Sequence, residues 1–139
     1  MSEPTLTAAQ LKRIHEALEK VPYAKLLAIE VDEIGVGTAT LSLPVRTELL
    51  QNNGVVHGGA VASLIDSTTA FAILSVIRED EKVTTVDLTI SYLRPVTKGR
   101  MRSSAKVIRA GRRLISVSAE VFDSTGTLTA TALSTYIKL

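Results

Sequence analysis

The chain has 139 residues, of which 45% are hydrophobic and 22% are charged, and its formal net charge is +2. This length and composition predict one globular domain over residues 1–139 and argue against extended disorder, because no low-complexity or single-sign segment interrupts the chain. The absence of cysteine excludes disulfides, thiolate nucleophiles and cysteine-based zinc sites, and two histidines are too few for a histidine-built site, so we expect no metal.

The first predicted element is an amphipathic helix within residues 1–22. Thr7 and Gln10 have the spacing of a capping box, and apolar residues then recur every three or four positions until Pro22, which we expect to end the helix. The segment is polar and has no apolar signal core, so we expect a cytoplasmic location.

Two strands are predicted over residues 27–45. Apolar and polar residues alternate on both sides of the Gly35 to Gly37 segment, as in Ala39-Thr40-Leu41-Ser42-Leu43. A period of two residues interrupted by glycines is typical of a β-hairpin.

A long central helix is predicted over residues 59–77. From Ala60 to Ile77 the chain reads AVASLIDSTTAFAILSVI, in which Asp66 is the only charged residue. A helix that is apolar nearly all round belongs in a protein core or in a membrane. Because the segment is at the short limit for a membrane span and contains Asp66 with several hydroxyl residues, we interpret it as a buried helix.

Four further strands are predicted after this helix, near residues 85–92, 100–109, 114–122 and 127–138, with turn residues between them. These spacings suit an antiparallel meander. The whole order therefore predicts an α+β fold in which an antiparallel sheet wraps around a long central helix. A single such sheet leaves free edges and an uncovered face, so we expect a homo-oligomer.

Basic residues are concentrated between Arg94 and Arg113. This segment holds eight of the 16 Lys and Arg residues and no acidic residue. Such a distribution favours a positive surface for a phosphorylated ligand, although a solvated strand face fits the pattern equally well.

The segment from Gln51 to Gly59 enters the central helix through His57-Gly58-Gly59. Glycines let a backbone approach a ligand closely, and the first amides of a helix are free donors with partial positive charge. The segment could therefore form an oxyanion hole. A tight loop with purely steric glycines is the alternative interpretation.

Asp66 is the strongest candidate for chemistry. A carboxylate within an apolar helix costs several kcal/mol unless it is hydrogen-bonded or paired, so Asp66 has either a structural hydrogen bond or a function. Gly58 and Asp66 are eight positions apart, or roughly 12 Å along a helix axis. If both act on one carbonyl group, they must come from two subunits whose helices are antiparallel across a twofold axis.

These residues also carry a family resemblance. Gln51, Gly54, His57-Gly58-Gly59, Asp66 and the strand from Thr85-Val86-Asp87 to Tyr92-Leu93-Arg94-Pro95 resemble the hotdog-fold acyl-CoA thioesterases of the phenylacetate-pathway (PaaI-like) type. The resemblance covers nearly the whole chain after the first helix. It implies a hotdog fold, an acyl-CoA substrate with an aromatic or a short to medium acyl group, a dimer or dimer of dimers, and no cofactor beyond the coenzyme A of the substrate.

The resemblance also implies roles for individual residues. Asp66 would be the nucleophile or general base, and the Gly58 N–H would polarise the thioester carbonyl. Gln51 would place the thioester or a water, Thr85 would orient the attacking water, and His57 would either contact the thioester or only shape the loop. Residues implied to bind substrate or coenzyme A are Asn53, Gly59, Asp87, Arg94, Pro95, Arg109, Ala110, Gly111, Arg112 and Arg113.

Three other functions compete with the thioesterase. A non-catalytic acyl-CoA sensor is disfavoured because a pure binder gains nothing from the Asp66 carboxylate. Nucleic-acid binding is disfavoured because the chain has only three Tyr and two Phe and no Trp to stack on bases. A hotdog hydratase or dehydratase fits the spacing of His57-Gly58-Gly59 and Asp66 less well. We also expect no membrane partner.

Overall fold

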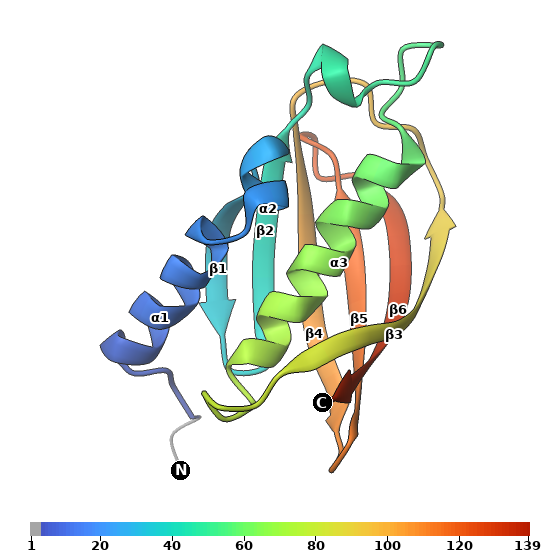
Figure 1. Ribbon diagram of the computed structural model, residues 1–139. Helices are drawn as coiled ribbons and strands as arrows, with labels where there is room; N and C mark the ends of the chain where they lie inside the picture. The colour runs from blue at the N-terminus through green and yellow to red at the C-terminus, as the bar shows by residue number, and fades with distance from the viewer. Residues whose placement is uncertain (1–3) are drawn as a thin grey trace.

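The computed structural model describes residues 4–139. A long helix, α3 (Gly58–Leu74), lies across one face of a six-stranded antiparallel sheet with the strand order β1-β2-β4-β5-β6-β3 (Figure 1). The strands are β1 (Glu30–Gly35), β2 (Thr38–Pro44), β3 (Val83–Tyr92), β4 (Arg100–Ala110), β5 (Leu114–Phe122) and β6 (Leu128–Lys138). The predicted α+β class, with a sheet around a central helix, is confirmed.

Two short helices precede the sheet. α1 (Ala8–Glu19) has the predicted capping box, in which the Thr7 side chain accepts from the Gln10 amide and the Gln10 side chain accepts from the Thr7 amide. The expectation that one helix runs to Pro22 is wrong, since Pro22 is the first residue of α2 (Pro22–Leu26). Proline fits a first helical position because its missing N–H has no intrahelical acceptor there. Residues 1–3 of the predicted segment lie outside the described part of the chain.

The order of the strands corrects the expected meander. β4, β5 and β6 are consecutive neighbours, but β3 pairs with β6 at one edge, and β4 pairs with β2 on its other side. α3 carries the chain across the sheet between β2 and β3, and β2 and β5 occupy the two sides of β4, so β3 lies at the far edge beside β6 (Figure 1). β1 and β3 are therefore the two edge strands.

A β-bulge interrupts β3 near its beginning. Thr85 pairs with Tyr136 and Asp87 with Thr135, so Val86 is the additional residue, and its side chain is 54% exposed. A strict two-residue period would place Val86 on the same face as Leu88, but the bulge shifts the alternation by one residue. Thr85 consequently faces the helix.

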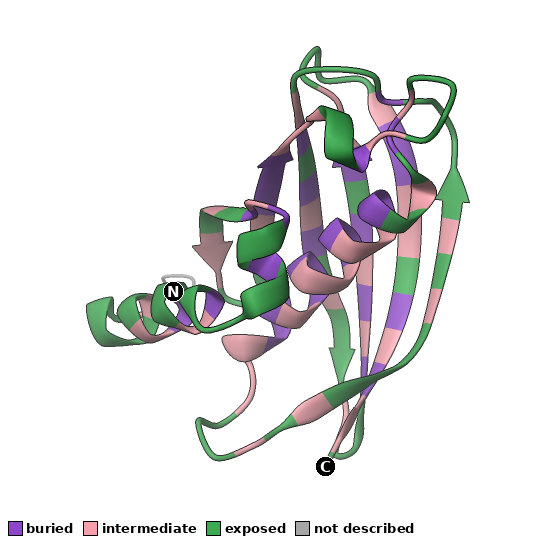
Figure 2. Cartoon of the chain, turned by 45° about the horizontal axis from the view of Figure 1, so that its top comes forward, coloured by how far each residue is buried: buried purple, intermediate pink, exposed green. Residues whose placement is uncertain are grey.

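α3 packs on β2, β4 and β5 through a buried face that includes Leu64, Ile65 and Thr68. Its opposite face is only half-buried, and its residues are small or polar: Ala62, Ser63, Asp66, Ser67 and Ala70 (Figure 2). The expectation of a helix buried all round is therefore wrong for a single chain. Among the helices of residues 4–139, none is long and apolar enough to cross a membrane.

Candidate active site

The N-terminus of α3 is shaped by a histidine cap. His57 is the N-cap residue, and its Nδ1 accepts a hydrogen bond from the Gly59 amide at 2.8 Å. The carbonyl of His57 accepts from the amides of Ala60 and Val61. Within the described residues, the Gly58 N–H donates to no protein atom. Gly58 thus supplies the free donor at the positive end of the helix dipole.

The hydrogen bond from the Gly59 amide also defines the tautomer of the His57 ring. Because Nδ1 accepts a hydrogen bond, the proton of a neutral ring is on Nε2. A Cβ atom at Gly59 would lie 3.0 Å from Nδ1, so a side chain at this position would push the ring away. These contacts agree with the interpretation that His57 shapes the loop.

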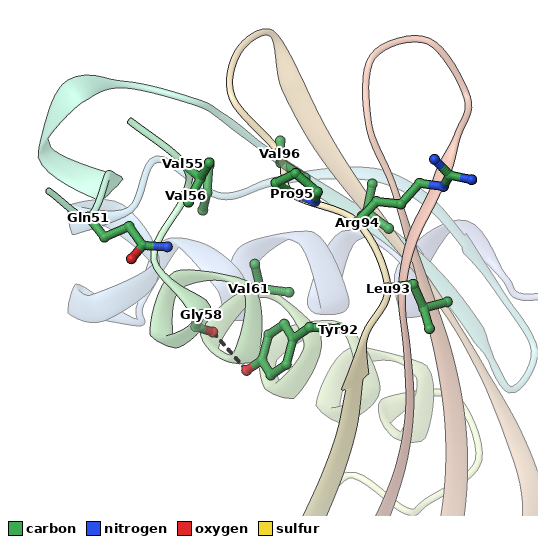
Figure 3. A pocket seen from close by; sticks show the side chains of 11 residues that line it. Gln51, Val55, Val56, Gly58, Val61, Tyr92, Leu93, Arg94, Pro95 and Val96 are labelled. Atoms are coloured by element: carbon green, nitrogen blue, oxygen red, sulfur yellow. Dashed lines mark hydrogen bonds between the residues drawn. The ribbon is translucent and has the colours of Figure 1, made fainter. Parts of the chain in front are cut away.

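A cavity of 290 Å³ opens beside this helix terminus (Figure 3). Four of the residues proposed from the sequence line it, namely Gln51, Gly58, Arg94 and Pro95. Tyr92, for which the sequence indicated no separate role, also lines it, and its hydroxyl donates to the Gly58 carbonyl at 3.0 Å. In Figure 3 the Arg94 guanidinium extends away from Gly58 toward the outside of the cavity.

Asp66 lies two turns further along α3 and does not line this cavity. Its Oδ1 accepts a hydrogen bond from Thr85 Oγ1 at 2.9 Å and a second from the Tyr136 hydroxyl at 3.1 Å. In residues 4–139, no hydrogen bond to Oδ2 is formed. Of the alternatives that the sequence left open for Asp66, the structure shows hydrogen bonds, and a function for its carboxylate stays a prediction. Its separation from Gly58, roughly 12 Å along a straight helix, means that one chain does not bring the two groups together.

Tyr136 is a candidate site residue that the sequence did not indicate. Its ring is 2% exposed, and its hydroxyl contacts Thr69 Oγ1 at 2.7 Å and the Asp66 carbonyl at 2.9 Å. Burial, opposed by the hydrogen bond with Thr69 and reinforced by the Asp66 charge, raises the pKa of Tyr136 from 10.0 to about 12. The alternation of β6 indicates a helix-facing side chain at position 136, but nothing in the sequence shows that it meets Asp66, seventy positions away.

The basic segment does not form one surface in the chain. Arg94 lies at the end of the sheet where α3 begins. The β4–β5 hairpin is at the other end, and it contains Arg109, Ala110, Gly111, Arg112 and Arg113 (Figure 1). β4 has 11 residues and separates the two groups by about 33 Å. Between them, Arg100 pairs with Glu30 at 2.9 Å and Arg102 with Asp32 at 2.8 Å. The expectation of a single positive field is therefore wrong for one chain.

Two further residues proposed from the sequence lie apart from both groups. Asn53 is exposed in the turn before α3, and Asp87 is exposed just after the bulge of β3. In the described part of the chain, no three His, Cys, Asp or Glu side chains come together as candidate metal ligands.

Comparisons with known proteins agree with this geometry. Residues 53–130 match the family model of the thioesterase superfamily. A Saccharolobus solfataricus protein, named as a putative esterase, is 34% identical over 127 residues, which cover 91% of this chain and 90% of that protein. The 1,4-dihydroxy-2-naphthoyl-CoA hydrolase of Escherichia coli is 29% identical over 73% of this chain and 75% of its own length. A point mutant of the phenylacetic acid degradation protein PaaI of Thermus thermophilus has a TM-score of 0.79 and 27% identity over 86% of this chain and 100% of that chain.

Proposed function

This chain belongs to the thioesterase superfamily and is a thioester hydrolase, and we propose that it cleaves acyl-CoA thioesters to a carboxylic acid and free CoA at a site shared by two copies of the chain. The observation that carries this proposal is the unused Gly58 N–H at the start of α3, beside a cavity and on the same helix as the anchored Asp66.

The Gly58 N–H acts in the transition state. Attack on a thioester moves negative charge onto the carbonyl oxygen, and a preorganised amide donor stabilises this charge by roughly 3 to 4 kcal/mol in comparable sites. Gln51 lines the same cavity and supplies an amide that can hold the carbonyl or a water in place. Since the Gly59 amide is used by His57, Gly58 is the donor that remains for the substrate.

Asp66 completes the reaction in one of two ways. As a general base, it takes a proton from water while the water oxygen attacks the carbonyl carbon, and the C–S bond then breaks to release CoA. As a nucleophile, its carboxylate attacks directly, CoA leaves, and water hydrolyses the resulting anhydride. In both cases, the role of Thr85 in orienting the attacking water stays a prediction, because its hydroxyl donates to Asp66 in the single chain. Neither route requires a cofactor.

The shared site follows from the distance along α3. Because Gly58 and Asp66 of one helix are roughly 12 Å apart, a second, antiparallel α3 must bring its own Asp66 to the first Gly58. Two features of the chain favour such a partner: the half-buried face of α3 that contains Asp66, and the free edge of β3. A dimer and a dimer of dimers both satisfy this requirement.

Pairing of two chains also accounts for the divided basic segment. The β4–β5 hairpin lies at the same end of the sheet as the beginning of β3, since Val83 pairs with Lys138 and Leu114 pairs with Ile137. Antiparallel pairing of two β3 edges therefore places the hairpin of one chain on the side where Arg94 of the other chain lies. We propose that Arg94 and the hairpin residues Arg109, Arg112 and Arg113, taken from two chains, bind the phosphates of CoA.

The test is release of free thiol from a panel of acyl-CoAs with aromatic, short, medium and long acyl groups. The named activity of the E. coli relative is a reason to include bicyclic aromatic thioesters. We expect the wild type to hydrolyse at least one of these acyl-CoAs. Asp66→Asn should be more than about 100-fold slower and should have the same elution volume on size-exclusion chromatography. Full activity of Asp66→Asn would exclude the proposed role of Asp66. Binding of CoA esters without any thiol release would instead favour a sensor.

A further inference from the structure

We propose that Tyr136 is a positioning residue for Asp66: together with Thr85 it holds Oδ1 of the carboxylate, so that Oδ2 is the oxygen that reacts. The proposal rests on the function proposed above for Asp66.

The contacts of Tyr136 support a chain of hydrogen bonds that ends on the carboxylate. A phenol has one proton to donate, and the Tyr136 hydroxyl lies 3.1 Å from Oδ1 and 2.9 Å from the Asp66 carbonyl. The Thr69 hydroxyl lies 2.7 Å from the phenol oxygen and 3.1 Å from the Asp66 carbonyl. It can donate to the phenol, which then donates to Asp66, or it can donate to that carbonyl, which leaves the phenol proton for Oδ1. Hydroxyl groups linked in this way strengthen one another in a buried site.

The two residues that contact Oδ1 lie opposite each other on neighbouring strands of the sheet. Thr85 of β3 and Tyr136 of β6 are direct partners across the two strands. The bulge at Val86 allows Thr85 to face the helix while Leu88, Ile90 and Tyr92 also face it. β-Bulges are frequent next to active sites because they redirect a side chain. Here the bulge adds a second donor to the oxygen that Tyr136 already contacts.

These contacts make the two carboxylate oxygens different. Oδ1 lies within hydrogen-bond distance of two hydroxyl groups, those of Thr85 and Tyr136, whereas Oδ2 has no such contact among the described residues. A carboxylate held at one oxygen has a fixed orientation, and its free oxygen keeps its lone pairs for the proton of a water or for the carbonyl carbon. Because burial keeps Tyr136 protonated up to a pKa of about 12, the phenol remains a donor wherever a carboxylate base is active.

The first experiment compares kcat and KM of the wild type and of Tyr136→Phe, which removes only the hydroxyl. Misplacing a catalytic group by about 1 Å can cost on the order of 100-fold, so we expect kcat to fall about 10- to 100-fold. KM should stay unchanged, because the cavity beside Gly58 is not altered. Tyr23→Phe is the matched control: it removes a hydroxyl that contacts Ser63 of the same helix at 2.8 Å and should leave kcat unchanged.

The second experiment combines Tyr136→Phe with Asp66→Asn. If Tyr136 acts only through Asp66, the double variant should be no slower than Asp66→Asn alone. Multiplied losses would overturn the proposal, as would an unchanged kcat in Tyr136→Phe or an equal loss in Tyr23→Phe. If Asp66→Asn itself keeps full activity, the proposed function fails first, which separates the two failures.

A folding defect in Tyr136→Phe would be recognised by circular dichroism and thermal unfolding. In that case Thr69→Val, which leaves the Tyr136 phenol in place but removes the hydroxyl that orients it, tests the same chain of hydrogen bonds. A reduced kcat with an unchanged KM supports the proposal, and a wild-type kcat in a folded Thr69→Val protein overturns it.

Discussion

Ionisation of Tyr136 should make the stability of this protein depend on pH in the alkaline range. In the folded chain, burial raises the pKa of the Tyr136 phenol from its ordinary value of 10.0 to about 12. Well below its ordinary pKa the phenol is protonated in both the folded and the unfolded state, so it causes no pH dependence. Between the ordinary and the raised pKa, the unfolded chain loses this proton more readily than the folded chain, and the free energy of unfolding therefore falls as the pH rises.

The size of this effect follows from the two pKa values. A difference of about two pKa units corresponds to about 2.7 kcal/mol over the whole range, of which about 1.4 kcal/mol should be lost by about pH 11. Tyr136→Phe cannot ionise and lacks this contribution. The free-energy difference between the wild type and Tyr136→Phe should therefore shrink by about 1.4 kcal/mol between about pH 9 and about pH 11.

The assay is urea unfolding of both proteins at four values from about pH 8 to about pH 11, at one protein concentration because an oligomer's stability depends on concentration. Comparing the two proteins at each pH cancels the ionisation of lysines and of other tyrosines. A difference that stays constant across this range would mean that the folded protein does not withdraw the phenol from water, and would refute the reasoning from burial.

Three further predictions concern the shared site and the helix terminus. Mixing inactive Asp66→Asn and Gly58→Val subunits under exchange conditions should restore about a quarter of wild-type turnover, because half of the dimers are hybrids with one intact site of two; no recovery despite proven exchange would exclude sites between chains. Gly59→Ala should lower the free energy of unfolding by about 1 kcal/mol in urea titrations, since the new Cβ would lie 3.0 Å from His57 Nδ1, and an unchanged midpoint would show that the cap is dispensable. Arg112→Gln should raise KM for acyl-CoA and weaken its salt dependence with kcat unchanged, whereas an unaltered KM would remove the hairpin from the CoA site.

Local sequence features determined many of the elements of this fold. The Thr7 and Gln10 capping box placed the beginning of α1, and the apolar segment around Asp66 placed α3, because both signals depend on residues within a few positions of each other. The same local geometry separates Gly58 from Asp66 by eight helical positions, so the sequence alone indicates that a site containing both groups needs two chains.

Contacts between distant segments were decided only by the tertiary structure. A two-residue period shows which strand residues share a face but not which strands are neighbours, so the expected meander misplaced β3. The bulge at Val86 is defined by pairing with β6, and it decides that Thr85 faces Asp66. Tyr136 meets Asp66 for the same reason, because two strands and a helix from separate parts of the chain must pack before their hydroxyl groups can converge on one carboxylate oxygen.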